Sequence, residues 1–440
     1  MIKFMLLIVT LFSGLSFSQT INTAKIDSLL NLLSSSNKVS GSISISKGGT
    51  NVYKKPFGFS YIKDGILIPS NDSTKYRIGS ITKIFTATMI FQLIDEGKLS
   101  LSSPLSKFFP KIPNAEKITL SNLLYHRSGI HNFTDDKEYL DYMVHPKTRD
   151  EMLAIISKRK PDFKPDQKTS YSNSNFILLG YIIEQVTQKS YEQNLTERIT
   201  SKIGLPNTYT GKKIDYNKNE SGSFKFENQW IQLPETDMSI PGGAGAIVST
   251  PSDMTRFIEA LFSCKLTSKE SLNQMQTLKD GFGMGLIPIP FYKKSGFGHN
   301  GGIDGFASIL AYFPEDSLSI AFCCNGVNYL FNDILIGILK IYFNDEYKLP
   351  DFTVITLKPE VLDKYTGIYS SKQLPLKITI SKNKSQLFGQ ATGQASFPLT
   401  PSSQNIFKFE QAGIVMEFNT EKNEMILNQN GGTYLFIREK

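Results

Sequence analysis

A serine and a lysine three residues apart open a strongly apolar segment of this 440-residue chain. Ser80 and Lys83 lead into an apolar run that continues to Ile94 and meets Gly97, a natural helix C-cap. Residues three apart share one face of a helix, so the serine oxygen and the lysine amine can meet as a nucleophile and its base. Because apolar residues lie almost all round this predicted helix, it should be buried. Desolvation would then lower the lysine pKa and leave a neutral amine.

The Ser-x-x-Lys pattern alone is a weak signal. None of its other copies in the chain opens a long apolar helix; they begin at Ser35, Ser44, Ser60, Ser157 and Ser381. The alternative for Ser80 is an ordinary helix-capping serine, with Lys83 as a solvated lysine of the first turn. A lysine at the start of an all-apolar helix is poorly placed for solvent, so the choice depends on what else the chain supplies.

Composition argues against several other kinds of site. The net charge is +8, but acidic residues are interleaved with the basic ones, so we expect no nucleic-acid partner. The three cysteines do not suit a disulfide framework, and we expect the adjacent Cys323 and Cys324 to lie in a strand. The four histidines lack metal-ligand spacing, so neither a metal site nor a cofactor is predicted.

The first 18 residues have the features of a secretory signal. Lys3 precedes an apolar run from Phe4 to Phe12, and small residues at Ser16 and Ser18 suit cleavage after Ser18. The alternative, a membrane anchor, needs a longer apolar run, and no later segment is long enough to span a bilayer. We therefore expect export to a periplasm or to the outside of the cell.

Periodicity predicts an α+β domain around the Ser80 segment. Strands are expected over 41–47, 52–53, 57–62, 281–286, 308–313 and 318–325. Helices are expected over 26–33, 119–124, 134–162, 176–186, 190–203, 251–262, 266–276 and 332–343, and a flexible turn over 241–246. The hairpin-like beginning leads the chain to Ser80.

The composition changes near Leu349-Pro350-Asp351. Short alternating segments separated by turns then follow at 376–380, 386–390, 406–410, 414–418, 425–428 and 433–437. Regular short strands predict a small antiparallel barrel or sandwich. We expect a signal peptide over 1–18, a catalytic domain over 19–350 and a barrel-like all-β domain over 351–440.

Two further motifs accompany the Ser80 motif. Tyr171-Ser172-Asn173 stands before an apolar helix, and His299-Asn300-Gly301 stands before two apolar strands. With Ser80-Ile81-Thr82-Lys83, they resemble the serine β-lactamase and penicillin-binding protein superfamily, in the branch of class C β-lactamases and their esterase and D-peptidase relatives. The resemblance covers roughly residues 25–345. It implies a β-lactamase/transpeptidase-like fold, with an antiparallel sheet flanked by helices and a mostly helical subdomain.

The resemblance also implies a role for each motif residue. Ser80 would attack a carbonyl and form an acyl-enzyme, and Lys83 would take its proton or hold its orientation. Tyr171 would shuttle a proton, as a phenol or as a phenolate stabilised by Lys83. Asn173 would bind Lys83 and a substrate amide. The backbone N–H groups of Ser80 and Gly302 would form an oxyanion hole, where each donor is worth about 3–4 kcal/mol. Taken singly, each residue also suits an ordinary structural role, such as a cap or a turn.

The third motif departs from that of true β-lactamases. A lysine there binds the substrate carboxylate, whereas this chain has His299, a residue with an unperturbed pKa of about 6.5. Asn300 also replaces the usual hydroxyl residue. We expect residues 299–302 to bind substrate, but the departure favours esterase, transesterase and D-peptidase activity over penicillin hydrolysis. His126, within 123–129, is expected to be a buried structural residue.

We therefore expect an exported serine hydrolase that works through an acyl-enzyme on an amide or ester. The substrate would be a D-amino-acid peptide, a β-lactam or a small ester, cell-wall-derived compounds included. The alternative is a penicillin-recognising receptor that is acylated without turnover. The choice of substrate, and whether the β domain covers the cleft or binds a partner, stay open at this point, as does the oligomeric state.

Overall fold

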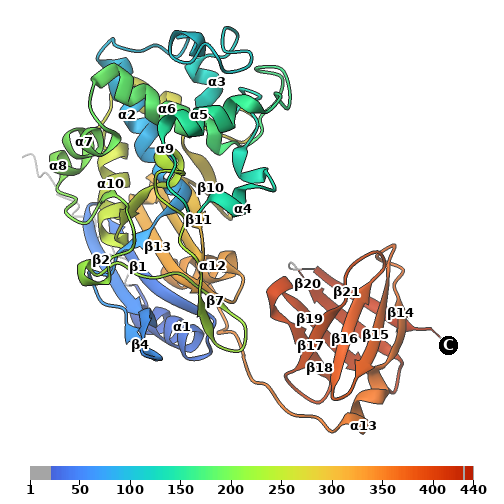
Figure 1. Ribbon diagram of the computed structural model, residues 1–440. Helices are drawn as coiled ribbons and strands as arrows, with labels where there is room; N and C mark the ends of the chain where they lie inside the picture. Colours follow the sequence, from blue (N-terminus) through green and yellow to red (C-terminus); the bar gives the residue numbers. More distant parts are fainter. Residues whose placement is uncertain (1–20, 430–431, 440) are drawn as a thin grey trace, which may run out of the picture.

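The computed structural model describes residues 21–429 and 432–439. The expected signal peptide lies outside these residues. Within the described ranges, no helix is both long and apolar enough to cross a membrane. Figure 1 shows a large α/β unit and, beyond a connecting segment, a separate barrel formed by the C-terminal strands.

The large unit is built on an antiparallel sheet with the strand order β10-β11-β12-β13-β1-β2. The strands are β1 (Val39–Lys47), β2 (Thr50–Phe57), β10 (Ile287–Phe291), β11 (Lys294–Ile303), β12 (Phe306–Phe313) and β13 (Leu318–Val327). The short strands β7 (Phe224–Phe226) and β8 (Trp230–Gln232) extend it beside β13. The expected strand 57–62 corresponds to β3 (Phe59–Lys63). This strand does not join the large sheet but pairs with β4 (Ile66–Pro69).

Both faces of the sheet are covered by helices, so its central strand is buried on both sides. In β13, Ile320 and Phe322 pack toward α1 (Thr23–Ser35) and α12 (Phe331–Tyr342). The alternate residues Ala321 and Cys323 belong to the second core, which includes α10 (Pro251–Phe262). Cys323 and Cys324 are buried, unpaired strand residues, as expected.

A mostly helical subdomain rises above one end of the sheet (Figure 1). Its helices are α2 (Thr82–Asp95), α3 (Leu120–Leu124), α4 (Tyr139–Tyr142), α5 (Arg149–Lys158), α6 (Asn173–Thr187), α7 (Tyr191–Leu195), α8 (Ser201–Ile203), α9 (Gly242–Gly245) and α11 (Lys269–Gln276). A small sheet of β5 (Tyr76–Arg77), β9 (Ile247–Ser249) and β6 (Tyr209–Thr210) joins it to the large sheet. The α+β expectation is thus confirmed.

Three expectations about local structure are wrong. The segment 134–162 is not one helix, because α4 and α5 are separated by irregular chain. Residues 281–286 do not form a strand, because Gly281 and Gly285 adopt left-handed backbone angles (φ 82° and 80°) and the chain pairs regularly only from Ile287. The predicted flexible turn over 241–246 contains the buried helix α9, whose backbone packs tightly on α6. A Cβ on Gly243 would lie 2.6 Å from Phe176 O, so only glycine fits there.

The C-terminal strands form a closed antiparallel barrel, which confirms the barrel-like expectation. Its strands are β14 (Gly367–Ser370), β15 (Lys377–Asn383), β16 (Gln386–Ala391), β17 (Phe397–Pro401), β18 (Ile406–Phe409), β19 (Ile414–Asn419), β20 (Glu424–Gln429) and β21 (Gly432–Arg438). Buried side chains such as Phe407, Met416 and Phe436 form its core. An ion pair between Lys38 and Glu410 links the barrel to the large unit.

Candidate active site

Ser80 lies on a tight turn that brings it against strand β11. It belongs to the 3-10 helix η1 (Gly79–Ile81), which runs directly into α2. Gly79 has a φ of 51°, and a Cβ on it would lie 2.8 Å from the nitrogen of Gly302. Only glycine permits this approach. The turn therefore places Ser80 beside the β11 backbone at the start of a buried helix.

Lys83 is fully buried and has three polar contacts. Its Nζ donates to Asn173 Oδ1 at 2.7 Å and to Ala244 O at 2.8 Å, and it lies 3.0 Å from Ser80 Oγ. Burial lowers the pKa of Lys83 well below its usual value. Since the amide and carbonyl oxygens accept its N–H groups, the lone pair of a neutral amine is left to face Ser80. Lys83 is thus arranged as a base for the serine hydroxyl.

Tyr171 approaches the same serine oxygen from the loop before α6. Its hydroxyl donates to Ser80 Oγ at 2.8 Å. Burial raises the pKa of Tyr171, with the Ser80 hydrogen bond opposing the shift. The structure therefore favours a neutral phenol over a phenolate in the resting state. A proton chain results, from the Tyr171 hydroxyl to Ser80 Oγ and from the Ser80 hydroxyl to Lys83 Nζ.

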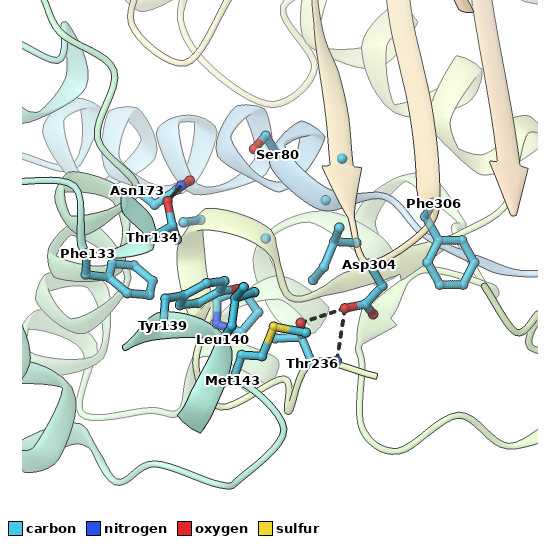
Figure 2. Close-up of a pocket in the computed structure, with 16 residues that line it drawn as sticks. Ser80, Phe133, Thr134, Tyr139, Leu140, Met143, Asn173, Thr236, Asp304 and Phe306 are labelled. Carbon is cyan, nitrogen blue, oxygen red and sulfur yellow. Dashed lines mark hydrogen bonds between the residues drawn. The ribbon is translucent and has the colours of Figure 1, made fainter. Parts of the chain in front are cut away.

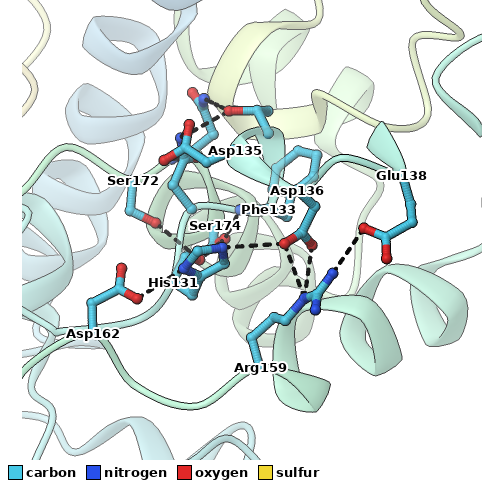
Figure 3. Close-up of polar contacts among 12 residues, drawn as sticks. His131, Phe133, Asp135, Asp136, Glu138, Arg159, Asp162, Ser172 and Ser174 are labelled. Atoms are coloured by element: carbon cyan, nitrogen blue, oxygen red, sulfur yellow. Dashed lines mark hydrogen bonds and ion pairs between the residues drawn. The ribbon is translucent and has the colours of Figure 1, made fainter. Parts of the chain in front are cut away.

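The first turn of α6 is held in place by a polar network (Figure 3). Asn132 Oδ1 accepts the backbone N–H of Asn173 at 2.9 Å, and the carbonyl oxygen of His131 accepts the Ser174 hydroxyl at 2.6 Å. The His131 ring lies between Asp162 at 2.8 Å and Asp136 at 3.2 Å. Although partial burial opposes protonation, these two carboxylates raise the pKa of His131. The network fixes Asn173, which in turn orients Lys83.

The third motif lies within β11 itself rather than ahead of a strand. Strand β10 pairs with β11 only as far as Gly298, so residues 299–302 face the site along an edge that no described strand occupies. His299 is buried, and its Nδ1 donates to the Asn300 carbonyl. Burial, and secondarily the charge of Lys83, lower the pKa of His299 to about 4. The ring is therefore neutral at pH 7, with Nε2 as its acceptor.

The two backbone N–H groups expected to form an oxyanion hole belong to Gly302 in β11 and to Ser80 in η1. Ile303 and Phe306 close a tight hairpin, so Gly302 falls in the next, non-hydrogen-bonded pair and its N–H points away from β12. The Ser80 N–H belongs to the first turn of η1, where backbone donors have no helical partner. Ser80 and Gly302 both line the cavities of the site, and the role of their N–H groups as an oxyanion hole stays a prediction. Gly301 has no room for a side chain, since a Cβ would lie 2.0 Å from Ile78 O.

Two cavities meet at Ser80 and Gly302. The first, of about 440 Å³, is drawn in Figure 2 and has a largely apolar wall that includes Phe133, Tyr139, Leu140, Met143 and Phe306. The second, of about 510 Å³, is lined by Tyr171, Gly281, Phe282, Ile287, Pro288, His299 and Asn300 as well as by the two shared residues. No Lys, Arg, Asp or Glu is among the described residues that line this second cavity.

The floor of the first cavity contains a buried ion pair. Asp304, in the β11–β12 turn, accepts from Arg77 at 3.0 Å. It also accepts from the Thr236 hydroxyl and N–H at 2.6 and 3.0 Å (Figure 2). Arg77 also donates to Glu235 at 2.8 Å. Asp304 is therefore the only charged residue lining this cavity within the described chain, and its carboxylate is already engaged.

The structure brings together Ser80, Lys83, Tyr171 and Asn173, and places 299–302 beside them. Sequence reasoning missed the carbonyl of Ala244, because a backbone acceptor has no residue-type signature. It also missed the pair of Arg77 and Asp304. The only signal for that pair was Asp304, which stands alone as a charged residue in the otherwise uncharged segment 295–314. No cluster of described residues could hold a metal ion.

The fold and the site together define a serine hydrolase with a β-lactamase/transpeptidase-like fold. A family model described as Beta-lactamase matches residues 29–336, and this chain belongs to that family. PbpX of Bacillus subtilis, which carries the name of a penicillin-binding protein, is 30% identical over 295 residues, covering 66% of this chain and 71% of the relative.

Two other similar proteins are named for hydrolysis. The teichoic acid D-alanine hydrolase of Staphylococcus aureus is 28% identical over 306 residues, which cover 67% of this chain and 74% of that protein. A crystal structure of a D-stereospecific amidohydrolase from Streptomyces sp. superposes with a TM-score of 0.63 at 25% identity, covering 73% of this chain and 98% of that one.

Proposed function

We propose that this serine hydrolase cleaves a D-aminoacyl ester or amide, with Ser80 as nucleophile and Lys83 and Tyr171 as its proton-transfer system. The observation that carries the proposal is the hydrogen-bonded chain from Tyr171 through Ser80 to a buried lysine. The names of the D-alanine hydrolase and the D-stereospecific amidohydrolase support the substrate class.

The chemistry follows from the contacts around Ser80. Lys83 takes the hydroxyl proton as Ser80 Oγ attacks the carbonyl carbon, and the N–H groups of Ser80 and Gly302 stabilise the oxyanion. Tyr171 donates its proton to the leaving oxygen or nitrogen, and the proton on Lys83 restores the Tyr171 phenol. Water then attacks the acyl-enzyme by the same steps in reverse order, which frees the acid and regenerates Ser80.

The uncharged lining described for the second cavity favours substrates without a free carboxylate on the leaving group. His299 is neutral at pH 7 because its pKa is about 4, and the described lining contains no lysine or arginine. A β-lactam or a peptide ending in D-alanine would place its carboxylate here without a cationic partner. Burying an unpaired charge is costly, whereas an uncharged ester or amide leaving group avoids this cost.

Steady-state turnover of matched D and L substrates by residues 19–440 would test the proposal. We expect D-alanine p-nitroanilide to be cleaved at least about tenfold faster than its L enantiomer, a difference of about 1.4 kcal/mol in transition-state stabilisation. A chromogenic cephalosporin should be a poorer substrate than either. Ser80→Ala should abolish turnover and labelling by a fluorophosphonate.

Each result separates one part of the proposal from the others. Labelling that persists in Ser80→Ala would refute the nucleophile. Equal rates for the two enantiomers would refute the D-aminoacyl substrate. A single burst of product without turnover, on every substrate, would support a penicillin-recognising receptor in place of a hydrolase.

We further propose that residues 1–18 direct export and that 19–350 and 351–440 are separate domains. The apolar run from Phe4 to Phe12 and the small residues before Gln19 support the first statement. The separate core of the barrel supports the second. Sequencing the N-terminus of the protein recovered from the periplasm or medium should show Gln19; an intact Met1 would contradict export by a cleaved signal.

A further inference from the structure

His126 holds the backbone on both sides of Tyr171. It follows helix α3 with a left-handed φ of 56°, and the chain turns there toward the second motif. Its carbonyl oxygen accepts the N–H of Ser170 at 2.9 Å. Its ring Nδ1 accepts the N–H of Ser172 at 3.1 Å. One residue therefore accepts the N–H groups of both neighbours of the tyrosine.

The ring of His126 also contacts the Tyr171 ring directly. The two ring centroids are 4.5 Å apart with an interplanar angle of 31°. Phe176 and Phe282 border the same imidazole at 5.2 and 5.8 Å, and only 3% of His126 is exposed. Burial, and secondarily the charge of Lys83, lower the pKa of His126 well below its usual value. The imidazole is thus uncharged and stacks against the Tyr171 ring.

The surrounding hydrogen bonds specify one tautomer of this ring. Ser128 Oγ accepts the N–H of Ile130 at 3.0 Å and donates to Asn175 Oδ1 at 2.6 Å. The amide of Asn175 must then turn its Nδ2 toward His126 Nδ1, which lies 3.4 Å away. Since Nδ1 faces this donor and the Ser172 N–H, it carries no proton, and the ring proton is on Nε2.

We propose that His126 is a positioning residue for Tyr171: it holds the phenol within hydrogen-bonding distance of Ser80 by accepting the N–H groups of Ser170 and Ser172 and by stacking on the Tyr171 ring. This inference rests on the proposed acyl transfer at Ser80. His126 touches neither Ser80 nor the space for a substrate, so its effect on the chemistry must pass through Tyr171.

Two substitutions separate the two contributions of the His126 side chain, while the backbone bond to Ser170 remains in both. His126→Phe keeps an aromatic ring but leaves the Ser172 N–H without its acceptor. His126→Asn keeps an acceptor close to the position of Nδ1 and tolerates the left-handed backbone, but it removes the ring. Because small displacements of a catalytic group are costly, we expect His126→Phe to lower the fluorophosphonate labelling rate about 100-fold. We expect His126→Asn to lower it about tenfold or less.

A double-mutant cycle with Tyr171→Phe distinguishes positioning from a general structural effect. If His126 acts through the Tyr171 hydroxyl, then in the Tyr171→Phe background neither His126 substitution should lower the labelling rate by more than about twofold. If His126 only supports the fold, each substitution should cost the same factor in both backgrounds. That result would overturn the inference, as would unchanged labelling by both variants.

The controls keep this result apart from the fate of the proposed function. His145→Phe, the same change at an exposed histidine, should label like the parent chain. If the parent chain itself is not labelled at Ser80, that result refutes the proposed function, and it does so independently of the double-mutant cycle. If His126→Phe yields no folded protein, the cycle with His126→Asn provides the same comparison. We then expect the labelling rate to fall by up to about tenfold in the chain that retains Tyr171 and not in the Tyr171→Phe chain.

Discussion

Asp304→Asn should destabilise the catalytic unit more than its single atom change suggests. The side chains of Asp304 and Arg77 are 0% and 2% exposed, and their ion pair ties the β11–β12 turn to β5. Asparagine preserves the shape, tolerates the turn's φ of 51°, and can still accept from Thr236. It replaces the oxygen facing Arg77 with an N–H donor, so that Arg77 loses a buried anionic partner.

The size of the effect follows from what remains around Arg77. Removing one partner of a buried ion pair typically costs about 3–5 kcal/mol, because the other charge is left uncompensated. Glu235 stays at 2.8 Å from Arg77, so we expect the lower end, about 3 kcal/mol. In a unit of about 330 residues, about 3 kcal/mol corresponds to a fall in Tm of about 4 °C.

Scanning calorimetry of the full chain would measure this shift. The transition to follow is that of the catalytic unit, since the barrel has a hydrophobic core of its own. Glu235→Gln is the matched control: its side chain is 27% exposed, and we expect a loss of only about 1 kcal/mol. A Tm for Asp304→Asn equal to or above that of Glu235→Gln would refute the reasoning.

Three further predictions concern the site and the barrel. Gly301→Ala should reduce labelling of Ser80 at least about 100-fold, because its Cβ would collide with the Ile78 carbonyl and displace β11; retention of the parent rate would show that β11 can yield there. The acid limb of kcat/KM should follow protonation of Lys83, so activity should rise as pH increases through a pKa below the usual 10.5 of lysine. His299→Gln should not change the pH at which this acid limb falls, since burial holds the pKa of His299 at about 4. A shift of the limb in this variant would show that the limb reports protonation of His299. A chain ending at residue 357 should retain the kinetics of the full chain, because both cavities are lined by residues no later than Phe306; altered kinetics would give the barrel a part in the cleft.

The catalytic motifs were predictable because each depends on residue type and spacing. A serine and a lysine stand at the start of one apolar helix, and Tyr-Ser-Asn stands before a second one. Helix capping and a solvated lysine would not by themselves require this combination. Helix α9 was not predictable, because its glycines and proline favour a turn locally and the helix exists only through tight packing on α6. The burial of His126 could be expected, but not the hydrogen bonds that it makes with both neighbours of Tyr171.

The barrel was also only partly predictable from local sequence patterns. Six of its strands show alternating side chains, but β14 is short, and β17 contains Pro398 and Pro401, which are unusual within a strand. Its closure depends on pairing between β14 and β21, at opposite ends of the segment. Pairing between such distant positions is not encoded in any local pattern.

The burial of Lys83 within α2 has a consequence for how this enzyme can diverge. Nearly every residue of that helix is packed in the core, so the same positions carry the chemistry and the folding of the unit. Variation there would be removed by selection for either property. Apart from the residues of β11 and its turn, the walls of the two cavities come mainly from the segments 133–143, 236–245 and 281–288, which lie outside α2. New substrate preferences can therefore arise in these segments while the reaction itself is inherited unchanged.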